Sequence, residues 1–118
     1  MSKQIGDEAE RVAKAFLIKR GLRWIMSNYH CRFGEIDLIM QEDDYLVFIE
    51  VRQRRSMRFG GALESIHRDK QRKMILSAQQ FQQAHKQWSD VPCRIDVLTL
   101  QGEPPVIDWI KNAIFNVV

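Results

Sequence analysis

The chain has 118 residues and carries 18 lysines and arginines against 15 aspartates and glutamates, which gives a formal net charge of +3 at pH 7. Hydrophobic residues make up 45% and charged residues 28%, a composition that excludes an intrinsically disordered chain. The length predicts a single domain over residues 1–118, large enough to bury one core without disulfide bonds.

The first predicted element is a helix over residues 6–20, where apolar side chains recur at three- and four-residue intervals. Acidic residues at its start and basic residues at its end suit the helix dipole, and Gly21 is placed to end the helix. The predicted buried stripe consists of Ala9, Val12, Ala13, Phe16 and Leu17.

Three strands are predicted next, over residues 22–32, 36–40 and 45–52. The polar segment 41–44 between the last two predicts an antiparallel hairpin in which Glu42 lies opposite Tyr45. Residues 53–61 are polar and rich in arginine and end in two glycines, which predicts a loop.

A second helix is predicted from Ser65 or Arg68 to Trp88. A strand follows over residues 93–100, then a turn over 102–105, and residues 106–110 form either a short edge strand or the start of a helix. This order predicts an α/β fold, a mixed β-sheet with an antiparallel hairpin flanked by two main helices. The buried face of the second helix is predicted to carry Met74, Ile75, Ala78, Phe81 and Trp88.

Acidic side chains gather on one face of the predicted hairpin. Because side chains alternate along a strand, Asp37 and Glu35 share one face of its first strand. With residues 43 and 44 at the centre of the turn, Asp37 lies opposite Glu50 and Glu35 opposite Arg52, with Cβ atoms about 4.5–5.5 Å apart. A turn centred one residue earlier would make Asp37 and Glu50 diagonal neighbours on the same face. The other, apolar face of the first strand is predicted to carry Ile36, Leu38 and Met40.

Two carboxylates at that separation repel each other and raise each other's pKa unless a cation lies between them. Mg²⁺ or Mn²⁺, which prefer oxygen ligands, would remove this conflict. Asp37 and Glu50 are therefore candidate metal ligands, and Arg52 adds a fixed positive charge beside them. The alternative is a surface face with cross-strand ion pairs, although aspartate and glutamate are poor strand formers and both strands are otherwise apolar.

Asp37, Glu50 and Arg52 lie in the first two of three motifs that follow one another along the chain. The motifs read GEIDLI at residues 34–39, VFIEVRQR at 47–54 and FGGA at 59–62. Their order and spacing resemble the YraN-like bacterial family, and the resemblance covers nearly the whole chain. That family in turn is similar to the PD-(D/E)xK nuclease superfamily, which includes the archaeal Holliday-junction resolvases. The resemblance implies a restriction-endonuclease-like core and metal-dependent hydrolysis of phosphodiester bonds in DNA, with branched DNA as one substrate form.

The resemblance also implies roles for single residues. Asp37 corresponds to the first metal-binding aspartate, Glu50 to the glutamate of the ExK motif, and Arg52 to the lysine of that motif. Arginine is always protonated, so Arg52 can stabilise a transition state but cannot abstract a proton. Glu10 on the first helix matches a further acidic metal ligand of some of these nucleases, with a solvent-facing or helix-capping charge as the alternative.

Basic residues are concentrated directly after the acidic pair. Between residues 52 and 73, eight lysines and arginines stand against Glu64 and Asp69, a net charge of +6. A solvated face usually interleaves both signs, so this imbalance favours phosphate contacts, which carry no sequence code. The predicted nucleic-acid-binding residues are Arg54, Arg55, Arg58, Arg68, Lys70, Arg72 and Lys73.

Three hypotheses follow for the function. The first is the metal-dependent nuclease, with Mg²⁺ or Mn²⁺ as cofactor and DNA as partner. The second is a non-catalytic nucleic-acid-binding module with the nuclease fold, and the third is a protein-interaction domain that uses the glutamine-rich second helix. A homodimer is expected by analogy with resolvases. The N-terminal residues show no signal sequence and the longest apolar run, residues 45–49, is too short to span a membrane, which predicts a cytoplasmic protein.

Overall fold

The computed structural model describes residues 7–54 and 66–114. The elements are two helices, α1 (Asp7–Lys19) and α2 (Arg68–Ala84), a short 3₁₀ turn η2 (Lys86–Trp88), and five strands, β1 (Arg23–Cys31), β2 (Gly34–Glu42), β3 (Tyr45–Arg54), β4 (Cys93–Gln101) and β5 (Val106–Ile114). Ser65, Arg55, Arg58 and the glycine-rich end of the predicted loop lie outside the described residues.

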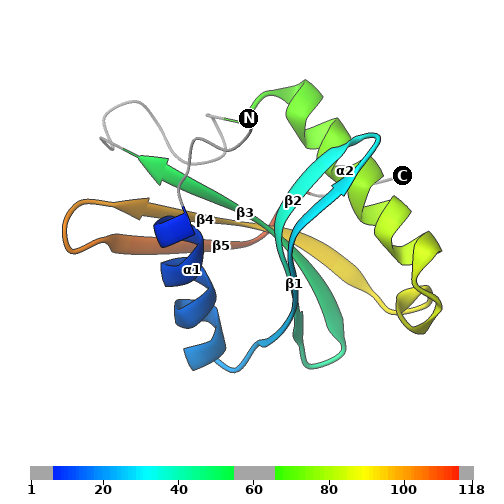
Figure 1. Ribbon diagram of the computed structural model, residues 1–118, viewed down its shortest axis with the longest axis horizontal. Helices are drawn as coiled ribbons and strands as arrows, with labels where there is room; N and C mark the ends of the chain where they lie inside the picture. Colours follow the sequence, from blue (N-terminus) through cyan, green and yellow to red (C-terminus); the bar gives the residue numbers. More distant parts are fainter. Residues whose placement is uncertain (1–6, 55–65, 115–118) are drawn as a thin grey trace.

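The five strands form one mixed sheet in the order in which they occur along the chain. Neighbouring strands are antiparallel except β3 and β4, which run parallel and are connected through α2. Figure 1 shows α1 beside the β3–β5 part of the sheet and α2 next to the β1–β2 hairpin. The predicted α/β fold, with a mixed sheet, an antiparallel hairpin and two main helices, is confirmed at this level.

Two apolar clusters fill the space between the sheet and the helices. On the α1 side, Ala13 and Leu17 pack with the inward residues of β2, β3 and β4, such as Ile49. In the other cluster, Met74 and Phe81 of α2 pack with residues of the same strands, and the ring of Phe81 stacks edge-on against Phe48 and Tyr29. Burial of apolar area on both faces of the sheet is therefore the main favourable contribution to folding.

Most of the predicted elements are confirmed within a few residues. Helix α1 ends before Gly21, whose φ of +99° suits a glycine after a helix C-terminus. Helix α2 ends at Ala84, earlier than predicted, and Trp88 belongs to the separate 3₁₀ turn. The last segment is a full strand, β5, rather than a helix start. None of the helices in the described part of the chain is long and apolar enough to cross a membrane.

Strands β2 and β3 pair in the predicted register only as far as Leu38. Glu42 lies opposite Tyr45, as predicted, and the ladder ends at the pair Leu38–Ile49. In Figure 1, β2 and β3 lie side by side near their turn and diverge farther from it. The predicted position of Glu35 opposite Arg52 is therefore wrong, because β2 no longer pairs with β3 at Glu35, which lies opposite His30 of β1 instead.

The predicted apolar face of β2 is also only partly correct. Leu38 and Met40 lie in the α1-side cluster, but Ile36 packs in the α2-side cluster together with Ile39. This change occurs where β2 leaves β3, since its partner there is β1 alone. A prediction that assumes strict alternation of side chains along a strand cannot anticipate this change in strand pairing.

A buried charged network connects β4 and β5. Asp96 has no exposed surface, and its carboxylate accepts hydrogen bonds from the guanidinium of Arg94, from Trp109 Nε1 and from the backbone N–H of Asn112. The β4–β5 register shifts at Asp96, and Asn112 adopts a φ of +52°. The carboxylate of Asp96 therefore satisfies a backbone donor that this irregularity removes from the ladder.

Arg94 extends this network to the β2–β3 turn. Its Nη2 atom lies 2.6 Å from Glu42 Oε1, and Lys111 Nζ lies 3.2 Å from Glu42 Oε2. Burial alone would raise the pKa of Glu42, but the hydrogen bonds from Arg94 and Lys111 outweigh it and lower the pKa below its ordinary value. Asp96 is thus paired with an arginine, and its contacts hold β4, β5 and the β2–β3 turn together.

We expect Asp96→Asn to destabilise the protein by about 3 kcal/mol, because it removes the charge that balances the half-buried guanidinium of Arg94. Urea unfolding monitored by tryptophan fluorescence measures this change. Asp108→Asn, an exposed position on β5, is the matched control and should change the free energy of unfolding by less than about 0.5 kcal/mol. Equal effects of the two substitutions would contradict the assignment.

Candidate active site

The two acidic residues of the predicted metal site lie side by side in the sheet. Asp37 belongs to β2 and Glu50 to β3, and each residue is only 5% exposed. The register of the ladder, with Leu38 opposite Ile49, brings them together at the point where the strands separate. Buried carboxylates of this kind are rare unless they are paired or bind a cation.

Asp37 is held by the neighbouring strand. The backbone N–H of Val51 donates a 2.8 Å hydrogen bond to Asp37 Oδ2. This bond takes the place of the ladder bonds that β2 and β3 no longer form beyond Leu38. The carboxylate of Asp37 is thus fixed to the backbone immediately after Glu50.

Glu50 lies between two cations that come from different elements. Arg52, two residues further along β3, places Nη1 3.4 Å from Glu50 Oε2. Lys70, in the first turn of α2, places Nζ 3.8 Å from the same oxygen. The site therefore combines two buried carboxyl groups with two partly exposed cations.

The pKa of Glu50 is raised to about 7. Burial is the largest cause, followed by the negative charge of Asp37, while the charges of Lys70 and Arg52 offset these effects only in part. The folded protein thus favours the protonated form of Glu50 over a wider pH range than an exposed glutamate would have. A bound divalent cation would replace that proton, because both relieve the repulsion between the two carboxylates.

Glu10 is buried, which excludes the solvent-facing alternative. It accepts a 3.1 Å hydrogen bond from the side-chain amide of Asn28 on β1. Asn28 lies between Ser27 and Tyr29, whose partners on β2 are Leu38 and Ile36, so Asn28 is the cross-strand neighbour of Asp37. Within residues 7–54 and 66–114, no three His, Cys, Asp or Glu side chains are grouped closely enough to hold a metal ion. Within the described residues, Glu10 is connected to the β1 neighbour of Asp37 through the side chain of Asn28.

The predicted phosphate-binding residues differ in the partners of their side chains and in whether the structure describes them. Arg72 and Lys73 both reach Asp69 within α2, at 2.7 and 3.4 Å, and Arg68 is exposed at the start of the helix. Arg54 ends β3, but its side chain lies outside the described part, as do Arg55 and Arg58. Among the described members of the set, Lys70 contacts the acidic pair.

Sequence reasoning missed Asn28. This residue has a φ of +54°, a conformation that asparagine adopts more readily than most residues. An asparagine in the middle of the irregular segment 22–32 was the available signal, because asparagine is a poor strand former. Its position opposite Asp37 depends on the β1–β2 register, which the sequence did not determine.

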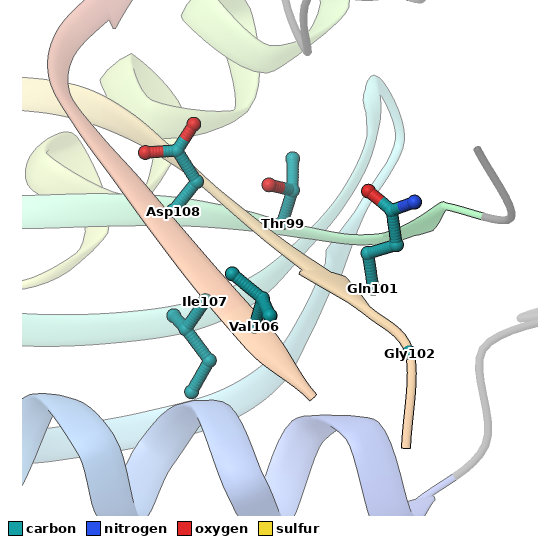
Figure 2. Close-up of a pocket in the computed structure, with 6 residues that line it drawn as sticks. All are labelled: Thr99, Gln101, Gly102, Val106, Ile107 and Asp108. Carbon is teal, nitrogen blue, oxygen red and sulfur yellow. The ribbon is translucent and has the colours of Figure 1, made fainter. Parts of the chain in front are cut away.

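A separate cavity of about 440 Å³ lies at the end of the β4–β5 hairpin (Figure 2). In the parallel β3–β4 ladder, Thr99 of this cavity pairs with Arg52 and Gln101 with Arg54. The cavity thus lies next to the basic end of β3, but it contains neither of the paired acids. Its lining residues are Thr99, Gln101, Gly102, Val106, Ile107 and Asp108.

Comparison with known proteins identifies a family. Residues 9–100 match the family described as Uncharacterised protein family UPF0102. A UPF0102 protein of Methylobacillus flagellatus is 48% identical over 112 residues, which cover 94% of this chain and 96% of the relative. UPF0102 proteins of Pseudomonas paraeruginosa and Legionella pneumophila (strain Corby) are 46% and 45% identical, with at least 93% of each chain covered.

We expect the stability of the protein to fall as the pH rises from 5 to 8, through the contribution of Glu50. The folded state keeps this group protonated up to about pH 7, whereas its ordinary pKa is 4.5, so between these values the folded state binds more protons than the unfolded state. Glu50→Gln removes the ionisation and should gain on the order of 1–3 kcal/mol relative to the wild type over this range.

Urea unfolding of both proteins at pH 5 and pH 8 measures this difference. Glu103→Gln, at an exposed position in the β4–β5 turn, serves as the control for removal of one carboxylate. Parallel pH dependences of the wild type and Glu50→Gln would show that Glu50 ionises at its ordinary pKa.

Proposed function

This chain belongs to the uncharacterised protein family UPF0102, and we propose that it is a metal-dependent nuclease that hydrolyses phosphodiester bonds in DNA. The observation that carries this proposal is the buried pair of Asp37 and Glu50, with Arg52 and Lys70 beside it. A module that only bound nucleic acid would gain nothing from buried acids, because they repel phosphate. The family match supports the predicted YraN-like resemblance, from which the nuclease chemistry is inferred.

The donor set fits Mg²⁺ or Mn²⁺. Mg²⁺ is commonly bound by one or two carboxylates together with waters and substrate phosphates, so two acids are sufficient. In this proposal Asp37 and Glu50 hold the metal ion, together with a backbone carbonyl next to Glu50. Glu10 supports the site through Asn28, as the cross-strand neighbour of Asp37, rather than as a direct ligand.

Held by Asp37 and Glu50, a metal ion would lower the pKa of a bound water, so that this water gives up a proton to solvent, and would polarise the phosphate. The oxygen of the resulting hydroxide would form a bond to phosphorus, the bond from phosphorus to the leaving oxygen would break, and the leaving oxygen would take a proton from solvent. Arg52 stabilises the negative charge that develops on the phosphate oxygens, where its planar guanidinium can donate two hydrogen bonds. Asp37 is kept in place by the N–H of Val51.

The arrangement of the sheet supports a restriction-endonuclease-like core. The two acids occupy neighbouring positions on the antiparallel strands β2 and β3, and α2 returns the chain to β4 parallel to β3. Helix α2 thereby begins close to the acidic pair, as its contact through Lys70 shows. Two basic residues of the described part, Arg52 and Lys70, thus lie beside Glu50.

The alternative is a non-catalytic nucleic-acid-binding module that retains the fold. The observation that favours it is Arg52, which stands where the superfamily motif has lysine. An arginine at this position still stabilises negative charge but cannot transfer a proton. The two functions differ in whether bound DNA is cleaved.

We expect the purified protein to cleave at least one member of a panel of linear, single-stranded, flapped and four-way-junction DNA in Mg²⁺ or Mn²⁺. Asp37→Asn and Glu50→Gln should each lower the cleavage rate at least 100-fold, because each removes a metal ligand. Asp44→Asn, at an exposed position in the β2–β3 turn, is the matched control and should cleave like the wild type. Gel analysis of end-labelled DNA, with EDTA as the metal-free control, gives the rates.

The outcomes of this experiment separate the hypotheses. Cleavage that persists in both variants would show that the acidic pair is not the site. Binding to DNA without cleavage in either metal would favour the non-catalytic module.

We expect DNA binding to weaken steeply with salt, since each phosphate contact releases condensed counterions. Arg68→Ala and Lys73→Ala should each reduce the slope of log affinity against log salt concentration by about one. Arg11→Ala, an exposed change of the same charge on α1, should leave the slope unchanged. Fluorescence anisotropy between about 50 and 200 mM salt measures the slopes, and nearly salt-independent binding would remove the electrostatic basis of the proposed interface.

A further inference from the structure

We propose that Lys70, from helix α2, contacts the phosphate group that is cleaved and so fills the role that a lysine at position 52 would have. This inference rests on the proposed nuclease function. It differs from the general expectation that Lys70, Arg72 and Lys73 all hold the flanking DNA backbone. The basis is the position of the Lys70 amine at the acidic pair.

The three basic residues of the first turns of α2 have different partners. Arg72 and Lys73 extend along the exposed side of the helix to Asp69, and all three of these side chains are more than half exposed. Lys70 points toward the sheet and reaches Glu50 Oε2 at 3.8 Å. Among the described lysines, Lys70 therefore brings an amine to the carboxylate of the proposed metal site.

Lys70 and Arg52 approach the same oxygen of Glu50 from different elements. The charges of Asp37 and Glu50 are balanced by these two cations when both acids are ionised. Binding of a divalent cation to the acids gives the group an excess positive charge, which attracts a phosphodiester and repels the Lys70 amine from Glu50. The amine is then released to the phosphate, the nearest new anion.

The side chain of Lys70 can make that change of partner without a change in the backbone. Its side chain is 40% exposed, and its four-carbon stem allows the amine to move while Cα stays in place. The 17-residue helix α2 begins at Arg68, and the preceding His67 forms no side-chain cap hydrogen bond with the helix. The positive end of the helix therefore adds to the attraction for a phosphate at this position.

The test compares Lys70→Ala, Lys70→Arg, Lys73→Ala and Lys19→Ala on the DNA form that the wild type cleaves. Lys70→Ala should lower kcat about 10- to 100-fold with little change in KM, since the contact forms on the phosphate that develops charge. Lys70→Arg should recover part of kcat, because the positive charge is retained. Lys73→Ala should raise KM instead, and Lys19→Ala, at an exposed position at the end of α1, should leave both constants unchanged.

A binding measurement gives a second readout that does not depend on cleavage. The affinity for the same DNA is measured in Ca²⁺, which takes the same oxygen ligands, and in EDTA. Lys70→Ala should weaken binding about fivefold in Ca²⁺ but much less in EDTA, where the amine stays with Glu50. Lys73→Ala should weaken binding by a similar factor in both solutions.

The outcomes are distinguishable. If the wild type cleaves no DNA, the proposed function and the inference about Lys70 both fail. If the wild type cleaves, and Lys70→Ala resembles Lys73→Ala in kcat, KM and the ratio of the two affinities, the nuclease proposal stands and Lys70 is only a general backbone contact.

Discussion

Two carboxyl groups buried next to each other impose the main electrostatic constraint on this protein. Asp37 and Glu50 cannot both be ionised at low free-energy cost in that position, and the pKa of Glu50, raised to about 7, expresses the conflict. Arg52 offsets it from β3, and Lys70 offsets it from α2. The path of the chain from β3 through α2 to the parallel strand β4 brings the second cation to the pair. A metal ion would therefore meet two acids and two cations that already lie together in the described part of the chain.

The parts of the fold that depend on local patterns were predictable from the sequence. The apolar stripe of α1, the glycine after it and the polar turn between β2 and β3 are all short-range signals. The turn fixed Glu42 opposite Tyr45, and counting back from it placed Asp37 beside Glu50. The candidate metal ligands were therefore predicted from the register of the hairpin, since the turn determines which residues of two paired strands lie opposite each other, and the family resemblance indicated the same two residues.

The remaining parts depend on long-range contacts, which local patterns do not contain. The sequence did not show that β2 leaves β3 at Leu38, so Ile36 was assigned to the wrong side and Glu35 to the wrong partner. It also did not show that Lys70 differs from Lys73, because both are basic residues at the start of one helix. The difference arises from how α2 packs on the sheet, where Met74 and Phe81 determine which side of the helix faces the strands.

The hydrogen bond from Val51 N–H to Asp37 has a mechanical consequence. Asp37 belongs by sequence to the β1–β2 hairpin, yet its carboxylate is anchored on β3, next to Glu50. The separation of the two acids is therefore set within one strand and its immediate neighbour, rather than by the position of the hairpin. A change in the position of the far end of the β1–β2 hairpin would therefore leave the spacing of Asp37 and Glu50 unchanged. The spacing of the acidic pair and the position of the hairpin end thus depend on different parts of the same sheet.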